Sequence, residues 1–234
     1  MSTGSVDRIM AETDLAEWAA EISAKPYGDR IYATSKWIAE RTLFRLFDIR
    51  HEGTEHLRTA PPVIIAPVHR SNLDSVIVGV LGGRRLPTLS KESLFKIKPV
   101  AWWIAGLGAI PLNRDAADRE ATTAARKILD DDKPLMIFPE GTRQSGQLIG
   151  ELFDGTAWIA AKTGASIVPV GIAGTEAALP QGAKFPKRAT VGVSVAEPIL
   201  MPEGRVPRSK LTEITTQMRE SLQAANNRAH ELIR

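Results

Sequence analysis

Cysteine is absent from the 234-residue chain. The protein therefore forms no disulfide, zinc ribbon or cysteine acyl-enzyme, and its composition fits a reducing compartment. A metal site is not expected either, because His51 and His56 have the wrong spacing for a zincin helix and Gly53 lies between them. We expect neither a metal nor a bound cofactor.

Long apolar runs are also missing. The longest nearly apolar stretch, residues 99–112, has about 14 residues, whereas a helix needs roughly 20 to cross a bilayer. The amino-terminal residues do not follow the charged, apolar and small-residue order of a signal peptide. We therefore expect a cytoplasmic protein without a membrane span.

Aromatic residues make up only 6% of the chain and form no base-stacking motif, so nucleic acid is not an expected partner. The net charge is only +3, but the basic residues are bunched. The groups are Arg84, Arg85, Lys91, Lys96 and Lys98, then Lys184, Lys187 and Arg188, then Arg205, Arg208 and Lys210. Bunched cations suit a phosphorylated ligand or an anionic surface.

From about residue 54 the pattern alternates between strands and helices. Strands are expected at 63–68, 86–90, 109–113, 135–138, 167–172 and 190–195. Helices are expected near 73–81, 93–106, 116–131 and 155–163, with a last one at about 208–233. Strands separated by helical lengths predict an α/β fold, in which a mainly parallel sheet is flanked by helices.

Residues from about 7 to 50 predict two helices, broken at the Pro and Gly turn of residues 25–29. The second helix is apolar over most of its circumference, so it must bury that surface. It either packs on the main domain or inserts Trp37 and Phe44 into a bilayer interface. In the second arrangement, Arg41 and Arg45 lie near the lipid headgroups.

The most informative stretch is residues 63–74, where a buried strand runs into a short polar turn. The turn carries His69 and, five residues later, Asp74. On one helix these two would lie about 140° apart, at roughly 100° per residue. They meet only if His69 is on the loop and Asp74 in the first turn of the next helix. Ser71 and Asp74 also have capping-box spacing, in which the carboxylate serves only the helix start.

In a parallel sheet the loops that follow the strands open on one edge, where ligands bind. Lys91 follows the second predicted strand of this region, and Arg114 follows the third. Both cations are therefore expected on the same edge as His69.

The loop after the fourth of these strands, residues 138–143, is suited to an oxyanion. Gly141 lets the backbone approach a ligand closely, Thr142 adds a hydroxyl, and Arg143 offers a planar fork for phosphate oxygens. Glu140 is expected to fix Arg143 or the hydroxyls of the ligand. A Gly-Thr turn with a solvated Arg143 is the structural alternative.

An imidazole oriented by a carboxylate acts as a base for an alcohol or a water. The chain offers no covalent nucleophile, since it lacks Cys and a Gly-x-Ser-x-Gly elbow. We expect His69 to deprotonate a substrate hydroxyl, which then attacks an electrophile. The phosphate-binding loop and the apolar stretch at 94–112 suggest a phosphorylated alcohol and an apolar partner, for which an acyl thioester is a suitable electrophile.

Four motifs in this order resemble the glycerophospholipid acyltransferase family, typified by 1-acyl-glycerol-3-phosphate acyltransferases. They are His69-x-x-x-x-Asp74 and residues 108–114, 138–143 and 167–170. Residues 91–95 are similar to the stretch that the family carries between the first two motifs. The resemblance covers about residues 50–200.

This resemblance implies acyl transfer from acyl-CoA or acyl carrier protein to a lysophospholipid, first of all 1-acyl-glycerol-3-phosphate, giving phosphatidic acid. His69 would be the general base, and Asp74 would hold its ring. Val168 and Pro169 would shape the acyl side. The acceptor phosphate would be bound by Lys91, Arg114, Glu140, Gly141, Thr142 and Arg143.

The resemblance further implies that residues 1–50 form a two-helix unit that docks on the inner face of the cell membrane, while residues 51–234 form the acyltransferase domain. Asn113 and Gln144 depart from the family pattern, which leaves the acceptor open but the catalytic pair intact. Glycerol 3-phosphate, another lysophospholipid and a glycolipid are the alternative acceptors. A non-catalytic peripheral lipid-binding protein is the alternative from another class.

Overall fold

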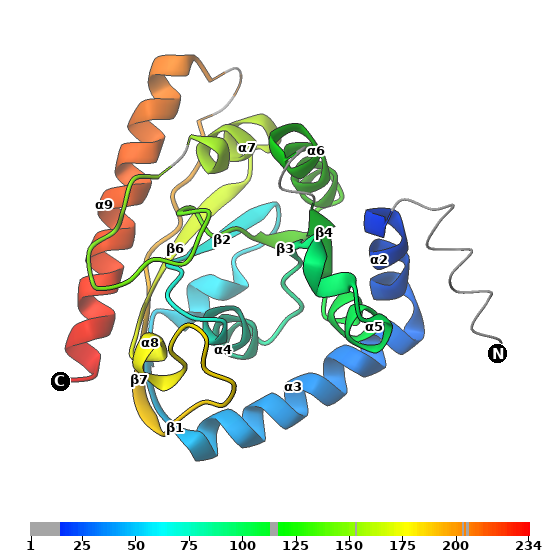
Figure 1. Ribbon diagram of the computed structural model, residues 1–234. Coiled ribbons are helices and arrows are strands. Elements are labelled where there is room, and N and C mark those ends of the chain that lie inside the picture. Colours follow the sequence, from blue (N-terminus) through cyan, green and yellow to red (C-terminus); the bar gives the residue numbers. More distant parts are fainter. Residues whose placement is uncertain (1–14, 113–116, 153, 203, 205) are drawn as a thin grey trace.

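The computed structural model describes residues 15–112, 117–152, 154–202, 204 and 206–234. The predicted helical residues 7–14 and the predicted site residue Arg114 lie outside these ranges. Within them the strands form one seven-stranded sheet in the order β1-β7-β6-β2-β5-β3-β4 (Figure 1). The strands are β1 (Phe47–Glu52), β2 (Val63–Pro67), β3 (Thr88–Lys91), β4 (Ala109–Leu112), β5 (Pro134–Met136), β6 (Ser166–Ala173) and β7 (Ala189–Val195).

Five neighbouring strands of this sheet, from β6 to β4, run parallel to one another. β7 is antiparallel to β6, and β1 is parallel to β7. The predicted α/β fold with a mainly parallel sheet is therefore confirmed, and the sheet is mixed at one end. The carboxyl ends of the five parallel strands share one edge, as the placement of the loops requires.

The helices cover both faces of the sheet. They are α2 (Leu15–Ala24), α3 (Pro26–Leu46), α4 (Leu73–Gly82), α5 (Lys98–Gly106), α6 (Ala117–Asp130), α7 (Gly155–Thr163), α8 (Thr175–Ala178) and α9 (Arg208–Leu232), with short 3-10 turns at Thr54–Arg58 and Glu92–Phe95. The chain moves outward from β2 through α4 and α5 to β4, and then returns through α6 and α7 to β6. Because such crossovers are right-handed, the reversal places α4 and α5 on one face and α6 and α7 on the other.

The core lies around the central strands β2 and β6, in which every residue is buried. On the face of α6 and α7, α9 packs directly on β6 and β7 (Figure 1). Two glycines allow this approach, since a Cβ on Gly171 would lie 2.2 Å from the Ala225 carbonyl carbon and one on Gly192 would lie 2.1 Å from the Ala229 oxygen. Neither strand position therefore accommodates a side chain without moving α9.

The expected helix through residue 50 ends earlier. α3 stops at Leu46, and residues 47–52 form the edge strand β1, which pairs with β7. Phe47 and Ile49 extend the apolar pattern of the helix, but alternating charges separate them, as in a strand with one covered face. The predicted helix at 93–106 also divides, into the turn Glu92–Phe95 and α5, because Pro99 favours the start of a new helix.

α2 lies on the outside of the domain at the β4 end of the sheet, and α3 runs along the outside from there to β1 at the opposite end (Figure 1). α2 packs on α5 and β4, whereas α3 crosses α4 and α5 and leads directly into β1 (Figure 1). Among the described residues, no helix combines the length and the apolar character needed to cross a membrane.

Candidate active site

The loops that follow two neighbouring strands lead to opposite faces of the sheet from its carboxyl edge. The loop after β2 leads to α4 on one face, and the loop after the adjacent β5 leads to α7 on the other. Diverging loops of this kind mark the topological switch point, and open α/β sheets bind their ligands in the crevice outside the strand ends at this point. His69 lies on the first loop, and Glu140 to Arg143 lie on the second.

His69 and Asp74 meet as the spacing predicts. His69 is on the loop, Asp74 is in the first turn of α4, and His69 Nδ1 lies 3.3 Å from Asp74 Oδ2. The side chain of His69 is 19% exposed and that of Asp74 is fully buried. The imidazole also stacks on Phe138, with ring centroids 4.0 Å apart. The ring is thus held at Nδ1 and on one face, which leaves Nε2 as the nitrogen available for proton transfer.

Asp74 serves the helix start and the imidazole together. Its Oδ2 accepts hydrogen bonds from the backbone N–H groups of Arg70, at 2.6 Å, and of Ser71, at 2.7 Å. The second bond is the carboxylate half of a capping box. The other oxygen, Oδ1, is buried and has no hydrogen-bond partner among the described residues. One carboxylate oxygen makes all three contacts, so Asp74 contributes to the helix start but does not serve it alone.

Glu140 is buried and holds the two loops together, rather than contacting Arg143. Its Oε2 accepts from Arg70 Nη1 at 2.7 Å and from the His69 backbone N–H at 3.1 Å, and Oε1 accepts from the Gly150 N–H at 3.4 Å. A further link joins the loops directly, from the Gln144 N–H to the His69 carbonyl at 2.8 Å. The position of the base is therefore tied to the loop that carries Arg143.

Arg143 is exposed and has no hydrogen bond or ion pair to another described residue. The two residues before it are engaged locally. The Gly141 N–H donates to the Phe138 carbonyl at 3.0 Å, and the Thr142 N–H donates to the Glu140 carbonyl at 2.7 Å. Gly141 has a φ of 68°, a left-handed conformation that favours glycine. The turn therefore exposes the Arg143 guanidinium, while the N–H groups of Gly141 and Thr142 are bonded to carbonyls within the turn.

The remaining predicted site residues are spread more widely. Lys91 ends β3, exposed, at the same edge of the sheet but two strands from β2. Val168 and Pro169 lie inside β6, in register with Ile65 and Ala66 of β2, and both are buried. They line no open surface in this structure, so their contact with an acyl chain stays a prediction.

Arg70 is the site residue that the sequence interpretation missed. Its side chain is only 4% exposed, and its guanidinium bonds to Glu140 and to the carbonyls of His69, Gly146 and Leu148. An arginine beside a histidine carries no local mark of burial, because three of these acceptors lie 70 or more residues away. The available signal in the sequence is that Arg70 and Glu140 are opposite charges on two loops expected on one edge of the sheet.

His230 of α9 lies near the charges of Arg70 and Arg234. Burial lowers the pKa of His230 below its usual range, and the nearby charges of Arg234 and Arg70 lower it further, while Glu176 opposes them. The neutral imidazole is therefore favoured at this position in the folded protein.

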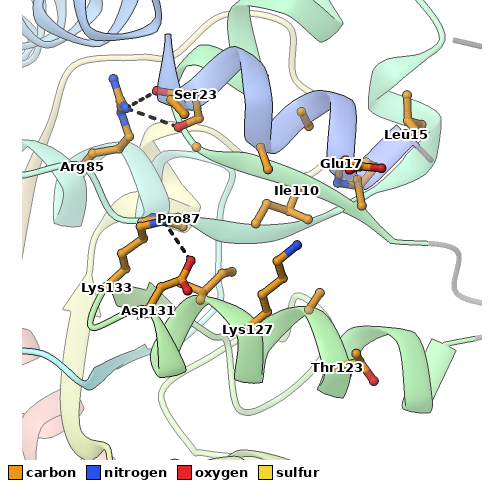
Figure 2. A pocket seen from close by; sticks show the side chains of 18 of the residues that line it. Leu15, Glu17, Ser23, Arg85, Pro87, Ile110, Thr123, Lys127, Asp131 and Lys133 are labelled. Atoms are coloured by element: carbon orange, nitrogen blue, oxygen red, sulfur yellow. Dashed lines mark hydrogen bonds and ion pairs between the residues drawn. The ribbon is translucent and has the colours of Figure 1, made fainter. Parts of the chain in front are cut away.

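A cavity of about 920 Å³ lies elsewhere, between α2, β4 and α6. Figure 2 shows Lys127 extending from α6 toward β4, with Arg85 bonded to Ser23 of α2 and Lys133 bonded to Asp131. His69 and Asp74 are not among the residues that line it. The cavity is therefore separate from the crevice at the switch point.

Comparison with known proteins identifies the family. The sequence profile described as Acyltransferase matches residues 48–173, more than half of the chain. A chloroplastic 1-acyl-sn-glycerol-3-phosphate acyltransferase of Arabidopsis thaliana is 29% identical over 153 residues, which cover 64% of this chain and 43% of that protein. The 1-acyl-sn-glycerol-3-phosphate acyltransferase of Haemophilus influenzae is 26% identical over 141 residues, 58% of each chain. The chain thus spans about half the length of these relatives.

A solved structure agrees with the sequence matches. The crystal structure of the 1-acyl-sn-glycerophosphate acyltransferase from Thermotoga maritima superposes with a TM-score of 0.68 at 26% identity, covering 88% of this chain and 79% of that one. Fold and crevice together define an α/β protein with a carboxylate-held imidazole at the switch point of its sheet. The chain belongs to the acyltransferase family.

Proposed function

We propose that this protein transfers a fatty acyl group from acyl-CoA or acyl carrier protein to the hydroxyl of a lysophospholipid, with 1-acyl-glycerol-3-phosphate as the acceptor and phosphatidic acid as the product. The observation that carries the proposal is the contact of His69 with a buried Asp74 at the carboxyl end of β2. The named activities of the relatives from Arabidopsis and Haemophilus support the choice of acceptor.

The reaction needs one base and no covalent enzyme intermediate. His69 Nε2 takes the proton of the acceptor hydroxyl while the oxygen attacks the thioester carbonyl carbon. The C–O bond forms, the C–S bond breaks, and the thiolate leaves. The imidazolium then returns its proton to that thiolate, so the enzyme ends unchanged. Asp74 keeps Nδ1 protonated and stabilises the imidazolium that forms between the two transfers, as a carboxylate does in an Asp-His pair.

Exposed cations at the carboxyl edge favour an anionic acceptor. Arg143 stands on the loop that Glu140 ties to His69, and Lys91 ends a strand at the same edge. A guanidinium binds phosphate oxygens in pairs, which fixes orientation as well as position. We propose that Arg143 is the principal phosphate ligand, with Lys91 and Arg114 as further cations and Thr142 as a hydroxyl donor.

The test is release of free thiol from acyl-CoA, measured with a thiol reagent in the presence and absence of acceptor. The chain contains no cysteine, so the enzyme adds no background to this assay. We expect release that requires lysophosphatidate, together with phosphatidic acid detected by mass spectrometry. A panel with glycerol 3-phosphate, other lysophospholipids and a glycolipid identifies a different acceptor. No acceptor-dependent release with any of them, despite vesicle binding, would instead identify a non-catalytic lipid-binding protein.

We also propose that the two-helix unit docks on the lipid surface from which the acceptor comes. On α3, Trp37 and Phe44 are each more than half exposed, and the Arg41 guanidinium lies 4.5 Å from the Trp37 ring centroid. On the adjoining α5, Trp102 and Trp103 are exposed by 42% and 48%. Exposed aromatic rings beside basic side chains are typical of an interfacial surface, in which Arg41 and Arg45 meet anionic headgroups.

Co-sedimentation with vesicles tests this surface. We expect binding to phosphatidylglycerol vesicles and weaker binding to phosphatidylcholine vesicles, because basic residues favour an anionic surface. The double variant Trp37→Ala, Phe44→Ala should bind more weakly. Leu200→Ala is the matched control, since Leu200 is 76% exposed on the segment before α9. Equal binding by the double variant and the control would refute the docking proposal.

A further inference from the structure

The connection between β5 and α7, residues 137–154, contains no helix or strand among its described residues, yet it carries Arg143. A loop of this length has many accessible conformations, and ordering one of them costs about 1–2 kcal/mol for each residue fixed. The loop therefore depends on contacts to the rest of the domain to keep Arg143 in place. Most of those contacts come from two directions, and one further bond runs from the Gly146 N–H to Glu176 Oε2 of α8 at 3.2 Å.

From the side of β2, Arg70 supplies the contacts. Its Nη1 donates to Glu140 Oε2 at 2.7 Å, its Nε donates to the Gly146 carbonyl at 2.8 Å, and its Nη2 donates to the Leu148 carbonyl at 3.1 Å. Its own backbone N–H donates to Asp74 Oδ2 at 2.6 Å. One residue thus bonds both to the carboxylate that holds the base and to the loop that carries the cation.

From the opposite side, the helix α9 supplies the contacts. The Ile149 N–H donates to Gln223 Oε1 at 2.9 Å, and Asn226 Nδ2 donates to the Gln147 carbonyl at 2.7 Å. Asn226 is fully buried. These bonds depend on the close approach of α9 to the sheet, which Gly171 allows.

We propose that Arg70 is a positioning residue that sets the place of Arg143 relative to His69, while Gln223 and Asn226 of α9 hold the same loop from its other side. The proposal rests on the proposed function for its kinetic consequences, but the positioning itself has an independent readout. A buried ion pair such as Arg70 with Glu140 is weak evidence for a role in stability, because its desolvation offsets much of its attraction. The planar fork of Arg70 reaches several acceptors in fixed directions, which the point charge of a lysine cannot do.

Hydrogen exchange measures the positioning without any substrate. In the wild type, the amides of Gln144 and Ile149 are bonded to His69 and Gln223, so a peptide covering residues 141–150 should exchange slowly. Arg70→Lys and Asn226→Ala should each raise its exchange rate at least several-fold. Gln217→Ala, at an exposed position of the same helix, is the control and should leave it unchanged. If this peptide exchanged at the wild-type rate in both Arg70→Lys and Asn226→Ala, the proposal would be overturned.

Kinetics then separate positioning from stability. Arg70→Lys should lower kcat/KM for the acceptor by roughly 10- to 100-fold, since a misplacement of about 1 Å costs about that much, while the KM for acyl-CoA stays unchanged. The double variant Arg70→Met, Glu140→Gln removes both buried charges together, so it should recover stability relative to Arg70→Met. It should not recover activity, because the Gly146 and Leu148 carbonyls still lack their donor. Recovery of both would show that Arg70 serves the fold alone.

Acyl transfer by the wild type and exchange in the Arg70 variant separate the proposed function from the positioning role. If the wild type transfers no acyl group but the exchange rates change as expected, the proposed function is wrong and the positioning stands. If the wild type is active and the exchange rates and the acceptor kinetics of Arg70→Lys are unchanged, the positioning is wrong and the function stands.

Discussion

Replacing Asp74 by asparagine tests the account of the base with little change of shape. A carboxylate and an imidazolium 3.3 Å apart attract each other by about 5 kcal/mol at an effective dielectric constant of about 20. Losing this charge should lower kcat by roughly 10²- to 10⁴-fold, the range expected for general-base catalysis. The KM for the acceptor should change little, because Asp74 is fully buried and does not reach the crevice.

The same change has a calculable effect on stability. The asparagine oxygen can still accept from the Arg70 and Ser71 amides, but its Nδ2 takes the buried position where Oδ1 has no partner among the described residues. An unsatisfied buried donor costs about 1–3 kcal/mol, which corresponds to a fall in Tm of about 2–12 °C for a chain of this size. Assays should therefore run well below the measured Tm.

Initial rates of thiol release at saturating donor and acceptor measure kcat, and circular dichroism confirms the fold. Asp48→Asn is the matched control, because Asp48 carries the same charge on β1 with a side chain 60% exposed. A folded Asp74→Asn protein with kcat within about threefold of the wild type, far short of the loss expected of general-base catalysis, would refute the reasoning. An Asp74→Asn protein in which only the KM for the acceptor changes would refute it as well.

Three further changes test other parts of the structure. Arg143→Gln should raise the KM for lysophosphatidate at least about tenfold and leave the KM for acyl-CoA unchanged, which steady-state kinetics would measure; equal effects on both substrates would contradict a phosphate ligand. Gly171→Ala should lower the stability in urea by about 1–3 kcal/mol, because the new Cβ meets the Ala225 backbone at 2.2 Å, whereas Gly79→Ala, with open space around it, should cost nothing. The pKa of His230 is lowered in the folded state, so the unfolded chain binds more protons below the usual value of about 6.5, and stability falls as the pH drops through that value. His230→Gln should therefore lose less stability than the wild type between about pH 7.5 and 5 in urea titrations, and an equal loss would contradict the assignment.

The placement of His69 and Asp74 could be predicted because it depends on two regular properties. Helical periodicity excludes a shared helix, and parallel strands bring the loops that follow them to one edge. The fold class followed from the same alternation of elements. Arg70 could not be found this way, because its acceptors Gly146 and Leu148 are 76 and 78 residues away and no local pattern marks them.

Two other differences between expectation and structure also arise from partners that are distant in sequence. The apolar residues Phe47 and Ile49 continue the pattern of α3, and the pairing of β1 with β7 sets the boundary between helix and strand. Glu140 is expected from the sequence to fix Arg143 or the hydroxyls of the ligand, but in the structure it accepts from Arg70 of the neighbouring loop at 2.7 Å. In both cases a partner distant in sequence decides the outcome.

The proposed function depends above all on His69 as the base of an acyl transfer. Its most direct measurement is the acceptor-dependent rate of thiol release from acyl-CoA by purified wild type and by His69→Ala, with phosphatidic acid followed by mass spectrometry. We expect product from the wild type and a loss of roughly 10²- to 10⁴-fold in the variant, with the fold intact. A folded His69→Ala protein that forms phosphatidic acid at the wild-type rate would contradict it.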